Sequence, residues 1–311
     1  MMQYNQTILV LCNVCGSDNT KPFRIGVDRL HGFEGRFQYV LCKNCGLVYM
    51  NPQIVPECIS RFYPDDYAPH QAPAAVSRQQ DAGAVPVPKP ELTKMILDTL
   101  NSQSRVLDIG CGNGEFLDRV RQFCHCRVNG VDTSGNAVLC AKKQYGLDVF
   151  QGEILAVPFE EKSFNLITAW SCVEHMNNPA QAVKKMFAIC KPGGYLFIKT
   201  PNYDSFAAKL FKDKWYHLDC PRHLYIFSPS TITALLEKCG FEVVNVCYEP
   251  SSKGWLGSLQ YVFYGDNHHP ATKNKLRRSS LAKAFVSPLS RLSAWLKKSD
   301  IMTVTARRKK P

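Results

Sequence analysis

Two pairs of cysteines near the N-terminus have the spacing of a metal site. Each pair has the form Cys-x-x-Cys-Gly, first at Cys12 and Cys15 and again at Cys42 and Cys45. Two such turns can direct four thiolates at one ion and close a tetrahedral zinc shell with no open position for catalysis. The pattern therefore predicts a structural zinc site that stabilises a small N-terminal module. Iron is the lesser choice of metal, and disulfides or a redox Cys-x-x-Cys are the non-metal alternatives.

A glycine-rich run in the middle of the chain could bind a nucleotide-like ligand. An apolar stretch leads through Asp108 into glycines at 110, 112 and 114. Without Cβ atoms, such a turn can approach a ligand closely and adopt positive φ angles. The carboxylate of Asp108 would repel a pyrophosphate but could hold an ammonium group. A nucleotide-phosphate or dinucleotide site is the alternative for this turn.

Asp132 ends the next expected strand. A carboxylate at that place can accept hydrogen bonds from both hydroxyls of a ribose. Its alternative role is the N-cap of the helix that follows.

A second group of reactive side chains lies in loops after the later strands. The long loop 200–227 combines Trp, Tyr, His and Arg, which could enclose a polar acceptor and supply a base. We expect the base to be one of His175, His217 and His223, in that order, and each has a structural role as its alternative. Glu174 could equally be a carboxylate at a helix N-terminus. We see no second set of metal ligands beside this site, so a magnesium-assisted catechol mechanism is not expected.

These residues need a sheet to position them, and the pattern from Glu91 onward predicts one. Short apolar runs alternate there with helical patterns of 10–15 residues, which is typical of βαβ units. We therefore predict an α/β fold, a doubly wound Rossmann-like sheet covered on both faces. The expected helices span 91–100, 114–123, 135–145, 179–190 and 229–239. The expected strands include 105–109, 148–151, 164–169, 195–199, 241–247 and 301–306.

Composition divides the chain into three regions. Residues 1–67 are rich in Cys, Gly and aromatic residues and form the predicted zinc ribbon. Residues 68–90 are rich in Ala, Pro and Gln and are predicted to be a linker. Residues 91–311 form the predicted α/β domain, with a basic helical insertion at 251–298 before the last strand.

Positive charge is concentrated in that insertion and the C-terminus. The chain carries +12 overall, and from Ser251 onward thirteen Lys and Arg stand against two Asp. Within 276–298, large apolar residues recur at helical spacing, and Trp295 follows near the end. One interpretation is a cap helix over the acceptor pocket, and the other is a helix that contacts an anionic membrane surface. The apolar residues are Leu281, Phe285, Leu289, Leu292 and Leu296.

The motifs after residue 105 resemble those of class I S-adenosylmethionine-dependent methyltransferases in order and spacing. They are VLDIGCGNGEF, VD at 131–132, GEILAVPFEEKSF, the Glu-His pair at 174–175 and KPGG at 191–194. The resemblance covers about 91–311 and implies S-adenosylmethionine as cofactor. Glu153 stands where the family more often has Asp, at the contact to the adenine amine. The implied cofactor-binding residues are Asp108, Gly110, Cys111, Gly112, Gly114, Asp132, Thr133, Glu153, Ile154 and Ser171.

The N-terminal region also resembles a known module. The cysteine pairs followed by GLVYMNP are similar to the zinc module of some sugar and natural-product methyltransferases. The resemblance implies methyl transfer to an oxygen or carbon of a small molecule, and we expect a sugar or glycoconjugate precursor. A quinone or phenol O-methyltransferase is the alternative within this class. An RNA- or DNA-binding zinc-ribbon protein and a non-catalytic scaffold are alternatives from other classes.

Two further expectations concern partners and location. No Asn/Asp-Pro-Pro-Tyr-type motif follows the fourth strand and the ribbon region is not strongly basic, so we expect no nucleic-acid partner. No apolar stretch approaches the roughly 18 residues of a membrane span, and the N-terminus lacks the features of a secretory signal. The expected location is the cytoplasm.

Overall fold

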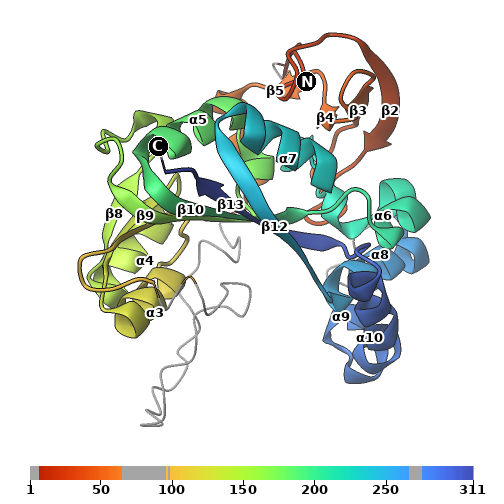
Figure 1. The fold of residues 1–311 in the computed structure, drawn as a ribbon. Coiled ribbons are helices and arrows are strands. Elements are labelled where there is room, and N and C mark those ends of the chain that lie inside the picture. The colour runs from red at the N-terminus through yellow and green to blue at the C-terminus, as the bar shows by residue number, and fades with distance from the viewer. Residues whose placement is uncertain (1–6, 65–95, 97–98, 266–274, 311) are drawn as a thin grey trace.

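A seven-stranded sheet forms the centre of the molecule (Figure 1). The computed structural model describes residues 7–64, 96, 99–265 and 275–310. The strands lie in the order β12-β13-β10-β9-β6-β7-β8, which confirms the predicted doubly wound α/β class. The predicted linker and most of the predicted helix 91–100 lie outside the described residues. The strands are β6 (Arg105–Ile109), β7 (Arg127–Asp132), β8 (Asp148–Gln151), β9 (Phe164–Trp170), β10 (Cys190–Pro201), β12 (Phe241–Glu249) and β13 (Ile301–Arg308).

The last strand departs from the expected parallel sheet. Strands β10, β9, β6, β7 and β8 run parallel to one another, but β13 pairs antiparallel with both β10 and β12. The segment between β12 and β13 therefore starts and ends at the same edge of the sheet. No helix has to carry the chain back across the sheet, as a parallel connection would require.

Helices cover the two faces of the sheet. The alternation of side chains along each strand directs Val106 and Leu166 to one face and Leu107 and Ile167 to the other, into two separate apolar clusters. Helices α3 and α4 pack on the first face, and α5 and α7 pack on the second. Their bounds are α3 (Glu115–Cys124), α4 (Gly135–Tyr145), α5 (Pro179–Ile189) and α7 (Pro229–Lys238).

The N-terminal region does not pack as an independent unit. Its three-stranded sheet gains a fourth strand, β11 (Tyr225–Ile226), which comes from the long loop 200–227 and pairs with β4. Tyr39 and Tyr49 belong to the same apolar cluster as Trp215, so one core joins the two regions. The elements are β1 (Thr7–Ile8), β2 (Thr20–Gly26), β3 (Phe37–Cys42), β4 (Val48–Met50), β5 (Gln53–Ile54) and α1 (Pro56–Ile59).

A buried charge cluster lies where these two regions meet. The side chain of Arg222 is completely buried and donates two hydrogen bonds of 2.8 Å to the two carboxylate oxygens of Asp28. It also bonds Asp219, at 2.7 Å, and the carbonyl oxygen of Phe62, at 3.1 Å. The Arg222 guanidinium holds the pKa of Asp219 below its ordinary value, although burial alone would raise it. The N-terminal region and the loop are therefore joined by a paired, fully desolvated ion cluster.

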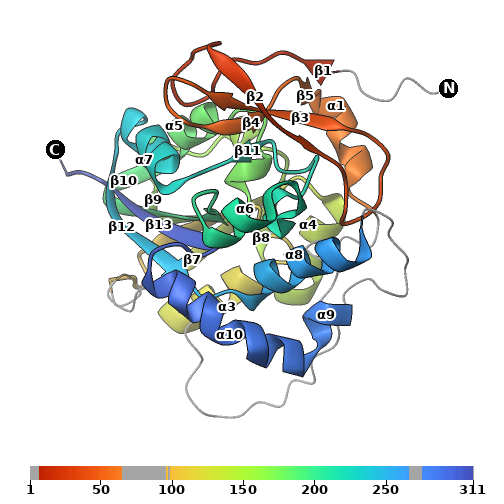
Figure 2. The same cartoon turned by 90° about the vertical axis from the view of Figure 1, so that its right-hand side faces the viewer.

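A group of helices lies on the side of the molecule away from β8 (Figure 1), and this side faces the viewer in Figure 2. Helix α8 contacts both α6 and α10, so α10 forms the outermost layer. No helix among the described residues is long and apolar enough to cross a membrane. The helices are α6 (Phe206–Phe211), α8 (Ser252–Tyr264), α9 (Lys275–Arg278) and α10 (Ser280–Trp295).

Replacing Asp28 by Asn should destabilise the fold. The amide can still accept the backbone hydrogen bonds from Leu30 and His31, but Arg222 loses one of its two anionic partners in a desolvated site. We expect a loss of about 3 kcal/mol in the free energy of unfolding, measured by urea denaturation of the zinc-loaded protein. The control is Asp213→Asn, which removes the half-exposed partner of Arg29 and should cost less than about 1 kcal/mol. Equal losses in the two variants would contradict this account.

Candidate active site

The glycine turn follows the carboxyl end of β6. Gly110, Gly112 and Gly114 have φ angles of 69°, 54° and 82°, which side chains rarely tolerate. A Cβ atom at Gly110 would lie 2.8 Å from the sulfur of Cys172. The amide of Gly110 donates to the carbonyl of Val131 at 2.8 Å, so the turn is fixed against the end of β7.

Asp132 lies at the end of β7, against this turn. Its carboxylate accepts a hydrogen bond of 2.8 Å from the amide of Gly112 and another of 2.8 Å from the amide of Ser134. The N-cap of α4 is Ser134, whose hydroxyl accepts from the amide of Ala137, so the N-cap alternative for Asp132 is wrong. The buried Asp132 carboxylate is thereby oriented at the carboxyl edge of the sheet, where ligands of open α/β sheets bind.

The other residues predicted to bind the cofactor differ in how far their side chains are exposed. Asp108 is buried under the turn and accepts a hydrogen bond of 2.6 Å from the hydroxyl of Thr168. Cys111 and Ile154 are also buried, and the Ile154 side chain belongs to the main apolar cluster, so only its backbone is available. The exposed residues at this edge are Thr133, Glu153 and Ser171.

Two of the three candidate bases come together. The rings of His175 and His223 are 4.6 Å apart between centroids and nearly perpendicular. His217 is not part of this pair, because its ring contacts Trp215 and Tyr216 and only its carbonyl oxygen reaches His223, at 2.9 Å.

Backbone carbonyls orient both histidines of the pair. The Nδ1 atom of His175 is 3.0 Å from the carbonyl oxygen of Arg222, and Nδ1 of His223 faces that of His217. Because a carbonyl can only accept, the contact with His217 places the proton of His223 on Nδ1 and leaves its Nε2 as the proton-accepting atom. The Nδ1 atom of His175 faces both the Arg222 carbonyl and the Tyr63 hydroxyl. Burial, reinforced by His223, lowers the pKa of His175 to about 3. Burial also lowers the pKa of His223. Both rings are therefore neutral at physiological pH.

Glu174 is completely buried beside the histidine pair. One of its oxygens accepts a hydrogen bond of 3.0 Å from the hydroxyl of Thr200, and the other has no hydrogen-bond partner in the part of the chain that the structure describes. Burial raises the pKa of Glu174 to about 8, so the group is largely protonated at neutral pH. Ligand atoms of Glu174, His175 and His223 lie within 4.8 Å of one another. The sequence indicated no second set of potential metal ligands, and the structure brings this one together.

Sequence reasoning missed the residues that support the pair. The hydroxyl of Tyr63 is 2.9 Å from Nδ1 of His175, and Asp219 is 3.7 Å from Nε2 of His223. Asp219 lies three residues before Arg222, in the long loop 200–227. The residues around Tyr63 and Asp28 contain no motif that predicts a role in this site. Both come from the N-terminal region, and only the tertiary fold brings them to His175 and Arg222.

The four cysteines of the N-terminal region converge. The sulfur of Cys12 is 3.4 Å from that of Cys45, the sulfur of Cys15 is 3.5 Å from that of Cys42, and all four lie within 4.8 Å of one another. A four-thiolate zinc site with Zn–S bonds of about 2.3 Å has sulfurs about 3.8 Å apart. The glycine after each pair has φ near 80°, and its amide donates to the carbonyl of the first cysteine. The donor set and its spacing therefore fit zinc.

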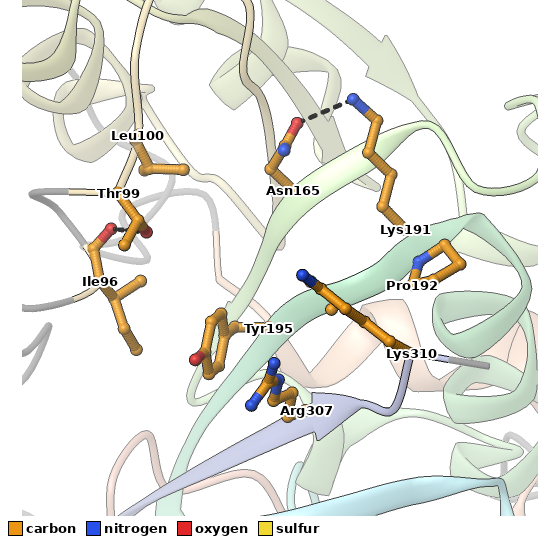
Figure 3. A pocket seen from close by; sticks show the side chains of 11 residues that line it. Ile96, Thr99, Leu100, Asn165, Lys191, Pro192, Tyr195, Arg307 and Lys310 are labelled. Carbon is orange, nitrogen blue, oxygen red and sulfur yellow. Dashed lines mark hydrogen bonds between the residues drawn. The ribbon is translucent and has the colours of Figure 1, made fainter.

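A pocket of about 290 Å³ lies elsewhere, at the opposite edge of the sheet (Figure 3). It is lined by Tyr195, Arg307 and Lys310, together with Lys191, which donates a hydrogen bond to Asn165. Asn165 is near the start of β9, whereas the glycine turn follows the end of β6. Because β6 and β9 are parallel, this pocket is separate from the glycine turn and the histidines.

The sheet order, the glycine turn and the oriented carboxylate at the next strand define a class I methyltransferase-type α/β domain. The chain belongs to the family described as "Methyltransferase domain", which matches residues 84–246, just over half of its length. One solved structure with a similar fold comes from Galdieria sulphuraria and carries the provisional description of a sarcosine dimethylglycine methyltransferase. Its TM-score is 0.52 and its sequence identity is 15%. That similarity covers 69% of this chain and 82% of the other.

Two curated relatives are similar over part of their length. An S-adenosylmethionine-dependent methyltransferase of Mycolicibacterium smegmatis is 30% identical over 139 residues, 44% of this chain and 52% of the relative. A ubiquinone biosynthesis O-methyltransferase of Bordetella bronchiseptica is 30% identical over 154 residues, 45% of this chain and 63% of the relative. The chain thus matches between half and two thirds of the length of these relatives.

Replacing Glu174 by Gln should change how stability depends on pH. The folded-state pKa of about 8 exceeds the ordinary value of 4.5, so the folded protein binds more protons than the unfolded chain between these values. The stability that protonated Glu174 contributes is fully present below about pH 4.5 and is lost as pH rises through about 8. The difference in free energy of unfolding between wild type and Glu174→Gln should therefore fall from pH 6 to pH 9, as urea titrations at fixed pH can measure.

The matched control is Glu115→Gln, which changes a half-exposed carboxylate paired with Arg119. Its difference from wild type should stay constant over the same range. A constant difference for Glu174→Gln as well would show that this carboxyl group does not gain a proton on folding.

Proposed function

We propose that this protein transfers a methyl group from S-adenosylmethionine to an oxygen or carbon atom of a small molecule. The observation that carries the proposal is the hydrogen bond from the glycine turn to Asp132, in a chain that belongs to a methyltransferase-domain family. S-adenosylmethionine would supply a methyl group activated by its positively charged sulfur. The protein would contribute mainly binding and orientation of the two reactants.

The residues at the carboxyl edge would divide the binding of the cofactor. Asp132 would accept hydrogen bonds from the ribose hydroxyls, and Asp108 would hold the ammonium group. Glu153 would contact the adenine amine. The glycines of the turn, with no side chains in the way, would let the backbone approach the ligand. The backbones of Cys111 and Ile154 would complete the site with the exposed residues Thr133 and Ser171.

The acceptor would meet imidazoles of low basicity. His175 and His223 are both neutral and could accept a proton, but burial lowers both pKa values, that of His175 to about 3, away from the value that serves a general base best at neutral pH. This observation favours an acceptor that is already acidic, such as a phenol or a reduced quinone, as the second candidate. The first candidate remains a sugar or glycoconjugate precursor, which the resemblance of the N-terminal region implies. The M. smegmatis and B. bronchiseptica relatives support the methyltransferase class, and the latter is named for a quinone pathway.

Calorimetric titration of the zinc-loaded protein with S-adenosylhomocysteine tests the cofactor. We expect micromolar binding that Asp132→Ala weakens about 100-fold, because charge-assisted hydrogen bonds to the ribose are lost. Asp148→Ala is the control, since this exposed carboxylate lies at the start of β8, away from the turn. Binding would justify comparing phenols, quinols and nucleotide sugars as acceptors. A folded protein that does not bind would fit the scaffold alternative instead.

We also propose that Cys12, Cys15, Cys42 and Cys45 hold one structural zinc ion. Burial raises the pKa of Cys12, and it raises that of Cys45 to about 11, so a cation is needed before four thiolates can coexist. Elemental analysis should find one zinc per chain and none in Cys15→Ser, which should also unfold at lower temperature. Cys58→Ser, in the same region but outside the cluster, should keep its zinc. Full zinc occupancy in Cys15→Ser would exclude this ligand set.

A further inference from the structure

Helix α10 is amphipathic, but its large apolar residues face outward and its small polar residues face the protein. Val286, Ser290 and Ser293 are the buried residues of this helix, so its inner side is small and largely polar. Leu281 and Phe285, which a cap helix would turn toward the protein, are 85% and 88% exposed. The outward stripe, as we name it, consists of Leu281, Phe285, Leu289, Leu292, Trp295 and Leu296, all exposed.

The spacing of these residues places them on one side of the helix. They recur at steps of three and four, which in a helix of 3.6 residues per turn gives a single face. Trp295, 78% exposed, extends this face to the end of the helix. A surface helix of a globular protein normally turns such a face toward the core. The predicted cap helix therefore does not use its apolar residues to close a pocket.

Positive charge borders the outward stripe. Arg291 flanks the stripe on α10, Arg278 precedes the helix and Lys297 follows it, and all three are exposed and have no ion-pair partner among the described residues. Lys283, two residues from both Leu281 and Phe285, is exposed on the other side of the helix. The sequence contains no Asp or Glu between residues 267 and 299. Two copies of the chain that paired through this stripe would bring these like charges together. An anionic surface would instead neutralise them.

We propose that α10 docks on an anionic lipid bilayer, with the outward stripe inserted at the headgroup level and the bordering Lys and Arg in contact with lipid phosphates. An apolar face with large aromatic residues and flanking cations is the combination that holds helices in a membrane interface. Phe263, at the end of α8, is also exposed, and α8 packs against α10.

The position of α10 determines which side of the protein would face the membrane. Its segment leaves the sheet at the end of β12 and returns at the start of β13, and both points lie at the carboxyl edge. The glycine turn and Asp132 lie at the same edge. Docking would hold the site on the side of the molecule that meets the bilayer, within reach of an acceptor carried in lipid. The docking itself rests on α10 alone and does not depend on the proposed function.

Flotation with lipid vesicles tests the proposal on the full-length, zinc-loaded chain. We expect the protein to float with vesicles of phosphatidylcholine containing 30% phosphatidylglycerol at low salt, and not with phosphatidylcholine alone. Phe285→Ser/Trp295→Ser should lose at least about 10-fold in vesicle affinity, because large apolar groups leave the interface. Arg291→Glu/Lys297→Glu should lose binding through charge alone and keep the stripe.

The control is Leu9→Ser/Leu139→Ser, which removes two exposed leucines, 77% and 53% accessible, far from α10. It should bind like wild type. Thermal unfolding of each variant shows whether it is folded. Failure of the folded wild type to float, or equal loss in the control, would overturn the proposal. A concentration-dependent dimer in light scattering that disappears in Phe285→Ser/Trp295→Ser would overturn it in favour of a second copy as the occupant.

Discussion

The buried charge of Arg222 is the constraint on which the arrangement of the candidate site depends. A guanidinium without exposed surface has to be surrounded by acceptors, and here they come from three segments: Asp28, the carbonyl of Phe62, and Asp219. Tyr63 follows Phe62 in the chain, and His223 follows Arg222. Satisfying this one cation therefore also brings the Tyr63 hydroxyl and both paired histidines together. The N-terminal region, whose four-cysteine cluster lies elsewhere, is in this way part of the candidate acceptor site.

Much of the fold could be predicted because its signals are local. The strand at 105–109 and the helix at 135–145 appear with the expected bounds, since the spacing of their apolar residues marks them directly. The direction of β13 could not be predicted, because antiparallel and parallel pairing use the same alternating pattern. The two-residue strand β11 is too short to have a pattern. For α10 the sequence predicted the apolar face, but not that Ser residues would occupy the inner side.

In the candidate site, too, the features that depend on local sequence could be predicted, and those that depend on tertiary packing could not. The glycine turn and Asp132 are close in space because adjacent parallel strands end together, which strand order alone implies. The pairing of His175 with His223 joins residues on separate loops, and the loss of His217 from that group follows from its packing against aromatic rings. The neutral state of these histidines is a property of burial, which residue spacing does not report.

The pairing of β4 with β11 also constrains the order in which the chain can be built. The hydroxyl of Tyr39 donates to the carbonyl of His223, and the carboxylate of Asp28 pairs with Arg222. The N-terminal region therefore binds residues that are synthesised more than 180 residues later. During translation the cysteine turns can form early, because their residues are close in sequence. The outer edge of their sheet stays unpaired until residue 226 leaves the ribosome, and an unpaired strand edge is open to wrong partners. The early cysteine cluster and the late strand are thus two parts of one assembly, and more than half of the chain is synthesised between them.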